Sequence, residues 1–193
     1  MSMTLCFASN NAHKVAEIRD MLGGHFVLKT LHDVGCHEDI AETADTIEGN
    51  SLLKAQYVWD NYQQNCFADD SGLEVEALAG APGVHSARYA GEHGNHAKNN
   101  ALLLQNLDNH KNRRARFKTV ITLLINGQVQ QFEGIVNGQI IAAPRGTQGF
   151  GYDPLFLPDG YDRTFAEMSI AEKSQLSHRA RAFQRLVAFL QEM

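Results

Sequence analysis

Two adjacent aspartates, Asp69 and Asp70, are the residues of this 193-residue sequence whose type and position most clearly suggest chemistry. They follow the short apolar run 66–68 and precede Ser71-Gly72. A carboxylate at a strand end can hold Mg²⁺ or orient a water molecule. Adjacent side chains of an extended chain point to opposite sides, so we expect only one of the pair to face a given cleft. The alternative is an Asp-Asp-Ser-Gly turn that satisfies its own backbone.

A phosphate-binding element is predicted near the N-terminus. The apolar run 4–8 indicates a strand, and a helical pattern begins at Lys14, with Ser9, Asn10 and Asn11 between them. A helix N-terminus favours phosphate, the three polar side chains can donate hydrogen bonds, and Lys14 adds a full charge. The two glycines of a Walker loop are missing, which argues against a P-loop kinase.

Two later segments carry further candidates for ligand contact. Residues 144–154 combine three glycines with Phe150 and Tyr152. Glycines let a backbone approach a ligand, and an exposed aromatic ring offers a face on which a base can stack, unless one of the rings plugs into the core. Residues 172–179 gather Lys, Ser, His and Arg on a predicted helix, where such a face is usually only solvated. A lone carboxylate such as Glu42, in the acidic stretch before the second helix, is also usually solvated.

Strands and helices alternate in the first part of the sequence, and antiparallel strand hairpins are predicted in the later part. The pattern predicts strands at 4–8, 26–31, 66–68, 73–78, 119–126, 129–136 and 139–143, and helices at 14–22, from 50, at 97–107 and at 171–192. Asn126-Gly127 and Asn137-Gly138 are expected to be turns, and the basic stretch 111–118 a solvated loop. We therefore expect one α/β domain over residues 1–193, with a mixed sheet, flanking helices and a cleft between two lobes.

Composition narrows the class of protein. The hydrophobic fraction of 44% and charged fraction of 20% are typical of a globular chain rather than a disordered one. A net charge of −5 argues against a protein that coats nucleic acid. We see neither an apolar run of about 18 residues nor a signal peptide, so no membrane partner is expected. Three cysteines without a CxxC pair predict no disulfide framework and favour a cytoplasmic location.

Together the motifs resemble the inosine triphosphate pyrophosphatase family over nearly the whole chain. Five of them occur in order: SNNAHK at 9–14, ADDSGLEV at 68–75, GAPGVHSARYAG at 80–91, GFGYDPLF at 149–156 and AEKSQLSHRARA at 171–182. The resemblance implies an elongated α/β fold, a homodimer, and Mg²⁺-dependent hydrolysis of ITP, dITP and XTP to the monophosphate and pyrophosphate.

The resemblance also implies roles for individual residues. Asp70 would be catalytic with Asp69 as support, and Mg²⁺ would be held by Glu42 and Asp70. The positions that would bind substrate are Ser9, Asn10, Asn11, Ala12, His13, Lys14, Lys54, Ser71, Arg88, Phe150, Gly151, Tyr152, Asp153, Lys173, His178 and Arg179. Within this set, the N-terminal group would hold the triphosphate, and Lys173, His178 and Arg179 would meet the base.

Two other functions are compatible with parts of the pattern. A Maf-like pyrophosphatase acting on dTTP or modified pyrimidines shares the chemistry, although different motifs are expected in place of FGYD and SHR. A purine nucleotide sensor without catalysis would not need a row of carboxylates near phosphates. Turnover assays on a nucleotide panel distinguish the three.

Overall fold

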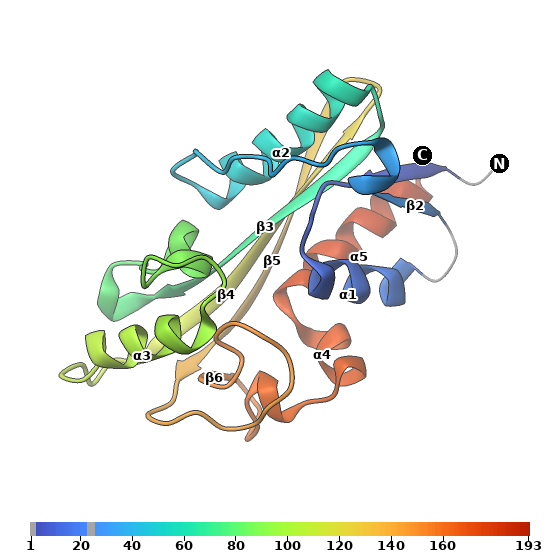
Figure 1. Ribbon diagram of the computed structural model, residues 1–193. Helices are drawn as coiled ribbons and strands as arrows, with labels where there is room; N and C mark the ends of the chain where they lie inside the picture. The colour runs from blue at the N-terminus through green and yellow to red at the C-terminus, as the bar shows by residue number, and fades with distance from the viewer. Residues whose placement is uncertain (1–2, 23–25) are drawn as a thin grey trace. The chain divides into compact units, whose positions relative to one another are not determined.

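The computed structural model describes residues 3–22 and 26–193. Six strands form a sheet in the order β2-β1-β3-β4-β5-β6 (Figure 1). The strands are β1 (Thr4–Phe7), β2 (Val27–Thr30), β3 (Cys66–Val75), β4 (Arg114–Ile125), β5 (Gln128–Ile140) and β6 (Phe156–Pro158). The helices are α1 (Ala12–Leu22), α2 (Ile47–Tyr62), α3 (His96–Asn106), α4 (Ile170–Leu176) and α5 (His178–Gln191), with 3-10 turns η1 (His32–Val34), η2 (Glu76–Leu78), η3 (Gly83–Arg88) and η4 (Phe165–Glu167).

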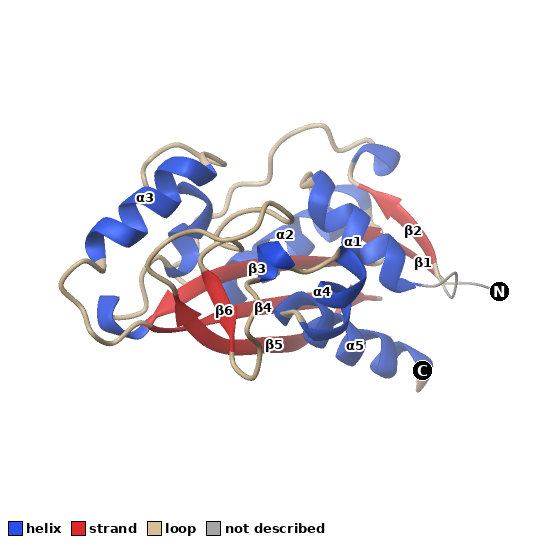
Figure 2. Cartoon of the chain, turned by 90° about the horizontal axis from the view of Figure 1, so that it is seen from below, coloured by secondary structure: helices blue, strands red, loops and turns tan. Residues whose placement is uncertain are grey.

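The sheet is mixed, as the sequence predicts. β1 pairs in parallel with β2 and with β3, and the adjacent strands β1 and β2 can be followed in Figure 2. β5 and β6 pair antiparallel. β4 and β5 are neighbours joined through the predicted Asn126-Gly127 turn, in which both residues have positive φ. None of the helices in the described part of the chain is long and apolar enough to span a bilayer.

The chain forms two compact units, each assembled from separate stretches. The first unit contains Met1–Asp70, Thr119–Gly134 and Ala180–Met193, and the second contains Ser71–Lys118 and Ile135–Arg179. The chain passes from the first unit to the second between Asp70 and Ser71.

In the first unit, the central strand β1 is covered on both faces. Phe7 stacks on Phe67 at 4.9 Å between ring centroids, in a cluster that includes Ile18 of α1 and Phe183 of α5. These two helices run beside each other in Figure 1. On the other face, Cys6 packs with residues of α2 such as Ala55 and Val58. Burial on both faces explains why this strand reads as a continuous apolar run.

α2 begins at Ile47, earlier than the sequence pattern suggested. Thr46 caps it by accepting a hydrogen bond from the Gly49 N–H, which satisfies one of the donors at the helix start. Ser51 connects the helix to the sheet, because its hydroxyl donates to the Ala68 carbonyl at 2.9 Å and is hydrogen-bonded to the Thr122 hydroxyl at 2.7 Å. These contacts fix the position of the face of α2 that carries Lys54.

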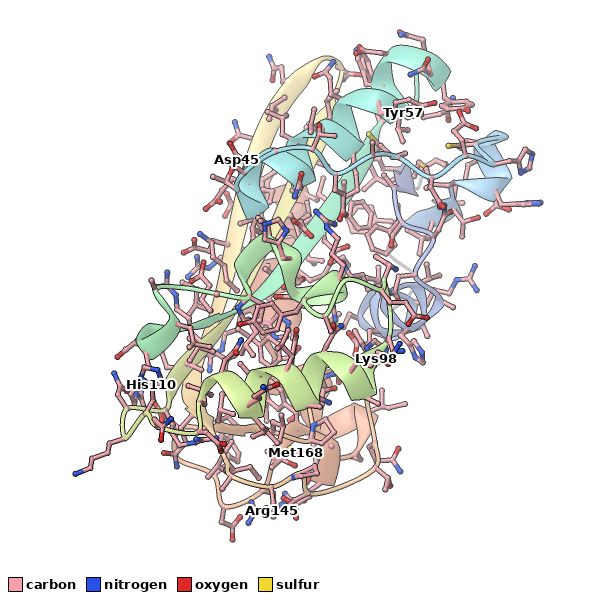
Figure 3. The ribbon with its side chains drawn as sticks, turned by 60° about the vertical axis from the view of Figure 1, so that its left-hand side comes forward. Asp45, Tyr57, Lys98, His110, Arg145 and Met168 are labelled. Atoms are coloured by element: carbon pink, nitrogen blue, oxygen red, sulfur yellow. The ribbon has the colours of Figure 1, made fainter. Side chains whose placement is uncertain are left out.

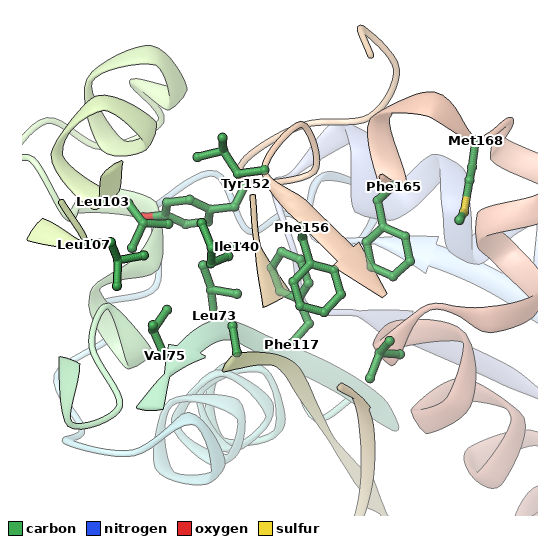
Figure 4. Close-up of a cluster of buried hydrophobic side chains, with 13 residues drawn as sticks. Leu73, Val75, Leu103, Leu107, Phe117, Ile140, Tyr152, Phe156, Phe165 and Met168 are labelled. Atoms are coloured by element: carbon green, nitrogen blue, oxygen red, sulfur yellow. The ribbon is translucent and has the colours of Figure 1, made fainter. Parts of the chain in front are cut away.

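The second unit is built around a separate apolar cluster. Leu73 and Val75 of β3, Leu103 and Leu107 of α3, and Phe117 of β4 are buried in it (Figure 4). Phe156 and Phe165 join the same cluster, with ring centroids 5.2 Å apart. Aromatic side chains bury large areas and pack in tilted or edge-on arrangements such as these.

Three sequence predictions for strands are wrong. β3 continues through Asp69-Asp70-Ser71-Gly72, so neither a turn nor a strand end occurs there. β4 already starts at Arg114, within the stretch predicted to be a loop. Arg114 and Arg116 are exposed and Ala115 and Phe117 are buried, and this alternation is typical of a strand. β5 continues through Asn137-Gly138.

Gly138 is in β5 for a steric reason. It lies opposite Pro158 of β6, and a Cβ added there would meet the Leu157 carbonyl oxygen and the Phe156 ring. The glycine therefore permits a close approach of two strands. The Asn137-Gly138 pair resembles a turn signal only because Gly138 follows an asparagine. β6 was absent from the predicted elements because three residues give too short a pattern.

The predicted helix 171–192 is in fact two helices. Ser177 is extended, with φ −67° and ψ 159°, and separates α4 from α5. Serine is a preferred residue directly before a helix, so the position of Ser177 before His178 was a signal for this break. The break places His178 and Arg179 in the first turn of α5, still within the second unit.

Candidate active site

The two aspartates of β3 are buried in the first unit. Asp69 is 0% exposed and Asp70 is 7% exposed. Lys14, two residues into α1, forms an ion pair with Asp69 at 2.9 Å between Nζ and Oδ2. Buried carboxylates require nearby compensation, and Lys14 supplies it for Asp69.

A second lysine compensates the other carboxylates. Lys54 of α2 is 7% exposed, and its Nζ lies 2.5 Å from Glu42 Oε1. Burial alone would lower the pKa of Lys54, but the charges of Asp70, Asp69 and Glu42 raise it. The solvated position that the residues alone favoured for Glu42 is therefore wrong, because its side chain is paired and only 26% exposed.

Glu42 and Asp70 differ in the balance of the forces that act on them. Burial is the largest influence on Glu42 and raises its pKa, but Lys54 and Lys14 outweigh it, and the pKa ends below its usual range. Burial also dominates at Asp70, where the two lysines only partly offset it. The pKa of Asp70 rises to about 6, so this carboxylate is a stronger base than an ordinary aspartate.

We call Lys14, Glu42, Lys54, Asp69 and Asp70 the carboxylate–lysine cluster. Among the residues that the structure describes, no three His, Cys, Asp or Glu side chains are arranged as ligands of one metal ion. That is compatible with Mg²⁺, which is typically held by one or two carboxylates and completes its shell with water and substrate phosphate oxygens. The hard oxygen donors of Glu42 and Asp70 suit this ion chemically.

The N-terminal segment is arranged differently from the simple anion site expected. Asn11 Oδ1 accepts from the N–H groups of His13 and Lys14 at 3.0 and 3.2 Å, and Ser9 Oγ accepts from the Asn11 N–H at 3.2 Å. Residues Asn10, Asn11, Ala12 and His13 are exposed, whereas Ser9 and Lys14 are half-buried. Asn10 donates to Asp39 at 3.1 Å. Two first-turn N–H groups are thus capped by the chain itself, and Lys14 carries the remaining positive charge of the segment.

The second unit brings together Phe150, Asp153, Lys173, His178 and Arg179, which we call the aromatic–cation cluster. Lys173 pairs with Asp153 at 2.7 Å, and the same Asp153 oxygen accepts from the Phe150 N–H at 2.9 Å. The Lys173 ammonium lies 4.9 Å from the centroid of the Phe150 ring. The expectation of a merely solvated helix face is wrong, since Lys173 and Ser177 are buried.

Arg179 and His178 complete this cluster. Arg179 is 2% exposed, with its Cζ 5.8 Å from the Phe150 centroid and its Nη2 3.5 Å from Ser71 Oγ. The His178 ring stacks on Phe117 at 4.6 Å with an interplanar angle of 9°. A buried guanidinium and a buried ammonium beside one aromatic face form a setting for an electron-rich flat group.

Two of the predicted substrate positions make structural contacts in the second unit. Tyr152 is a core residue (Figure 4). Its hydroxyl donates to the Ser86 carbonyl at 2.7 Å. Its ring therefore matches the alternative of an aromatic plugged into the core, not an exposed stacking face. The Gly151 carbonyl accepts from Asn100 at 3.0 Å. Arg88 ends η3 and is half-buried.

Two aromatic residues that pack against His178 were not among the residues predicted from the sequence. Phe117 and Phe165 both lie near its ring, at 4.6 and 6.3 Å between centroids. The signal for Phe117 was the alternation of charged and apolar residues over 114–117, which was interpreted as a loop. No local pattern marks Phe165 as a neighbour of residue 178.

Gly149 offers a test of how Asp153 is held. Its φ is +73°, and a Cβ added there would collide with the Asp153 carboxylate. We expect Gly149→Ala to displace Asp153 and Lys173 and to raise KM for the nucleotide by about tenfold or more. Steady-state kinetics checks this, with Gly160→Ala as the control, because Gly160 has a φ of +83° but open space around the added Cβ. Equal kinetics for both variants would contradict the expectation.

Comparisons with known proteins identify the family. The family model described as the Ham1 family matches residues 5–189. A protein of Flavobacterium johnsoniae named dITP/XTP pyrophosphatase is 53% identical over 188 residues, covering 97% of this chain and 98% of that protein. A protein of the same name from Porphyromonas gingivalis is 52% identical over 187 residues, covering 96% of each chain.

Solved structures agree with these sequence matches. The Coxiella burnetii HAM1 protein superposes with a TM-score of 0.92 and 34% identity, covering 99% of this chain and 100% of that one. The Staphylococcus aureus Ham1 protein gives a TM-score of 0.90 and 37% identity, covering 98% of both chains. With motifs, fold and near-complete coverage in agreement, this chain belongs to the Ham1 family.

Proposed function

We propose that this chain is a pyrophosphatase that hydrolyses deaminated purine nucleoside triphosphates, such as ITP, dITP and XTP, to the monophosphate and pyrophosphate. The observation that carries the proposal is the carboxylate–lysine cluster, in which Asp70 is buried with a pKa of about 6 near two lysines. Relatives named dITP/XTP pyrophosphatase at 50–54% identity support the substrate class.

In this proposal, the first unit handles the triphosphate and the attacking water. Asp70 accepts a proton from the water at a carboxylate oxygen as the water attacks the α-phosphorus, and pyrophosphate leaves. Lys14 and Lys54 offset the negative charge that develops on the leaving group. Asp69 supports the reaction by holding Lys14, its partner at 2.9 Å.

We propose Mg²⁺ as the cofactor, with Glu42 and Asp70 as the residues that would hold it. When bound, it would supply Lewis-acid polarisation of phosphate oxygens and neutralise part of their charge. The chain itself has a net charge of −5, and three of the five members of the carboxylate–lysine cluster are acidic, so a cation is needed if a polyanion is to bind there.

In the second unit, the aromatic–cation cluster selects the base. Inosine and xanthosine carry a 6-keto acceptor where adenosine carries a 6-amino donor. Arg179 and His178 can donate to a keto oxygen, whereas the amino group would leave those buried donors without an acceptor. A site built to hydrogen-bond one group can reject the wrong partner by up to about 10⁴-fold. The Phe150 ring is the stacking surface in this proposal.

A panel of nucleotides tests the function. Pyrophosphate and orthophosphate release are measured for ITP, dITP, XTP, GTP, ATP and dTTP, with and without Mg²⁺. We expect pyrophosphate as the product, dependence on Mg²⁺, and kcat/KM for ITP and XTP above that for ATP by about 10²-fold or more. Preference for dTTP would indicate a Maf-like enzyme, and tight purine binding without turnover would indicate a sensor.

We further propose that the protein is a cytoplasmic homodimer. The three cysteines are free thiols buried in the first unit, which suits a reducing compartment. The family resemblance supports the dimer, and light scattering at assay concentration measures its mass directly.

A further inference from the structure

Two helices of this protein begin with the same device. Asn50 is the fourth residue of α2, and Asn99 is the fourth residue of α3. Both are buried, at 0% and 2% exposure. In each, the side-chain Oδ1 accepts from a backbone N–H of the segment that leads into the helix, that of Ala44 at 2.9 Å and that of Ala90 at 2.8 Å. The segment before α2, which also carries Asp45, is seen in Figure 3.

The two asparagines differ at the other end of the amide. Asn99 Nδ2 donates to the carbonyls of Ser86 and Ala87, at 3.5 and 3.2 Å. Asn50 Nδ2 is buried and has no hydrogen-bond partner within residues 3–22 and 26–193. A buried amide donor without a partner is unfavourable, because it gives up its hydrogen bond to water on folding and gains none in return. Rotating the amide does not remove the problem, because the NH₂ group would then face the Ala44 N–H.

The position of Asn50 relates it to the carboxylate–lysine cluster. Lys54 follows Asn50 by one helical turn, so both side chains lie on the same face of α2. Ala44, which Asn50 holds, is two residues beyond Glu42, and Glu42 pairs with Lys54 at 2.5 Å. Helical side chains lean toward the N-terminus, which directs Lys54 back toward residue 50. Asn50 therefore ties together the two segments that supply Glu42 and Lys54.

We propose that Asn50 is a further phosphate-binding residue of this enzyme. Its Oδ1 holds the Glu42 segment in place, and its Nδ2 donates to a phosphate oxygen of the nucleoside triphosphate. Nδ2 is covered in this structure, so neighbouring side chains must shift for a phosphate oxygen to reach it, and the new hydrogen bond would satisfy a donor that otherwise has no protein partner. This inference rests on the proposed hydrolysis of nucleoside triphosphates.

The test separates the two ends of the amide. Asn50→Asp keeps an oxygen for the Ala44 N–H and removes the donor, and Asn50→Ser replaces the amide by a shorter hydroxyl that does not reach the position of Nδ2 and adds no charge. We expect both variants to fold and to lower kcat/KM for ITP by about 10²-fold, the loss typical when one hydrogen-bond donor to the reacting group is removed. The ratio of kcat/KM for ITP to that for ATP should not change, because the base is not contacted. Titration calorimetry with Mg²⁺ and inorganic pyrophosphate should show binding weakened by about tenfold.

Asn99→Asp is the matched control. It makes the same chemical change but removes two satisfied hydrogen bonds in the second unit, so it should lower the melting temperature and leave kcat/KM for ITP within about threefold. Folded Asn50→Asp and Asn50→Ser variants with wild-type kcat/KM and pyrophosphate affinity would overturn the inference while leaving the proposed function intact. A wild-type chain that releases no pyrophosphate from any purine triphosphate would instead overturn the proposed function.

Discussion

Asp70→Asn is expected to lower kcat for pyrophosphate release from ITP by roughly 10³-fold, with the fold intact. Asn keeps the size of the side chain and one acceptor oxygen but can neither take a proton from water nor hold a cation as a carboxylate does. Asp159→Asn is the control, because Asp159 is a half-exposed carboxylate paired with Arg114 at 2.7 Å in the second unit. Turnover by Asp70→Asn close to that of the control would show that another group activates the water.

The same substitution is expected to stabilise the protein at alkaline pH. Burial raises the pKa of Asp70 from 3.8 to about 6, so the folded state holds a proton that the unfolded state releases between these values. Stability from this group therefore falls as pH rises through that window, and the loss is complete above about pH 6. Asn carries no charge, so the variant should gain up to about 3 kcal/mol in free energy of unfolding near pH 8 and almost nothing near pH 4.

Denaturant unfolding of both proteins in EDTA, at a series of pH values, measures this difference. A gain that grows between about pH 4 and pH 6 and then levels off is the expected result. A variant that loses stability relative to the wild type as pH rises through this range would mean that the charge of Asp70 stabilises the fold. Loss of activity combined with a gain of stability would show that the buried charge of Asp70 lowers the stability of the fold but is required for activity.

Arg179→Lys is the second change with a large expected effect. The guanidinium is 2% exposed and lies near Phe150 and Ser71, where its planar fork offers several fixed donors. Lysine keeps the charge but not this geometry. We expect kcat/KM for ITP to fall by about 10²-fold and that for ATP to change little, so that most of the preference for the keto base is lost.

Arg113→Lys is a matched control for that experiment. Arg113 is also in the second unit, and its guanidinium donates to the carbonyls of Ile140, Leu107 and Ile141. The control should lose stability but keep the ratio of kcat/KM for ITP to that for ATP. If Arg179→Lys lowers kcat/KM for ITP and for ATP by the same factor, Arg179 supports the structure of the aromatic–cation cluster and does not discriminate between the bases.

Local signals in the sequence predicted much of the fold. Runs such as 4–8, which is buried on both faces as β1, and the Asn126-Gly127 turn depend on residues adjacent in the chain. Predictions failed where a distant partner overrode a local preference. Asn137-Gly138 has the composition of a turn, yet Gly138 lies in β5 because β6 approaches it closely.

The sequence by itself determined the family resemblance, the order of the motifs and the types of residue available for chemistry, because these depend only on identity and spacing. Only the tertiary structure decided which charges are buried together. Lys14 with Asp69, Glu42 with Lys54, and Lys173 with Asp153 are far apart in the chain. Charge burial depends on the surroundings that folding creates, so Glu42 and Lys173 looked like solvated surface residues when each was considered alone.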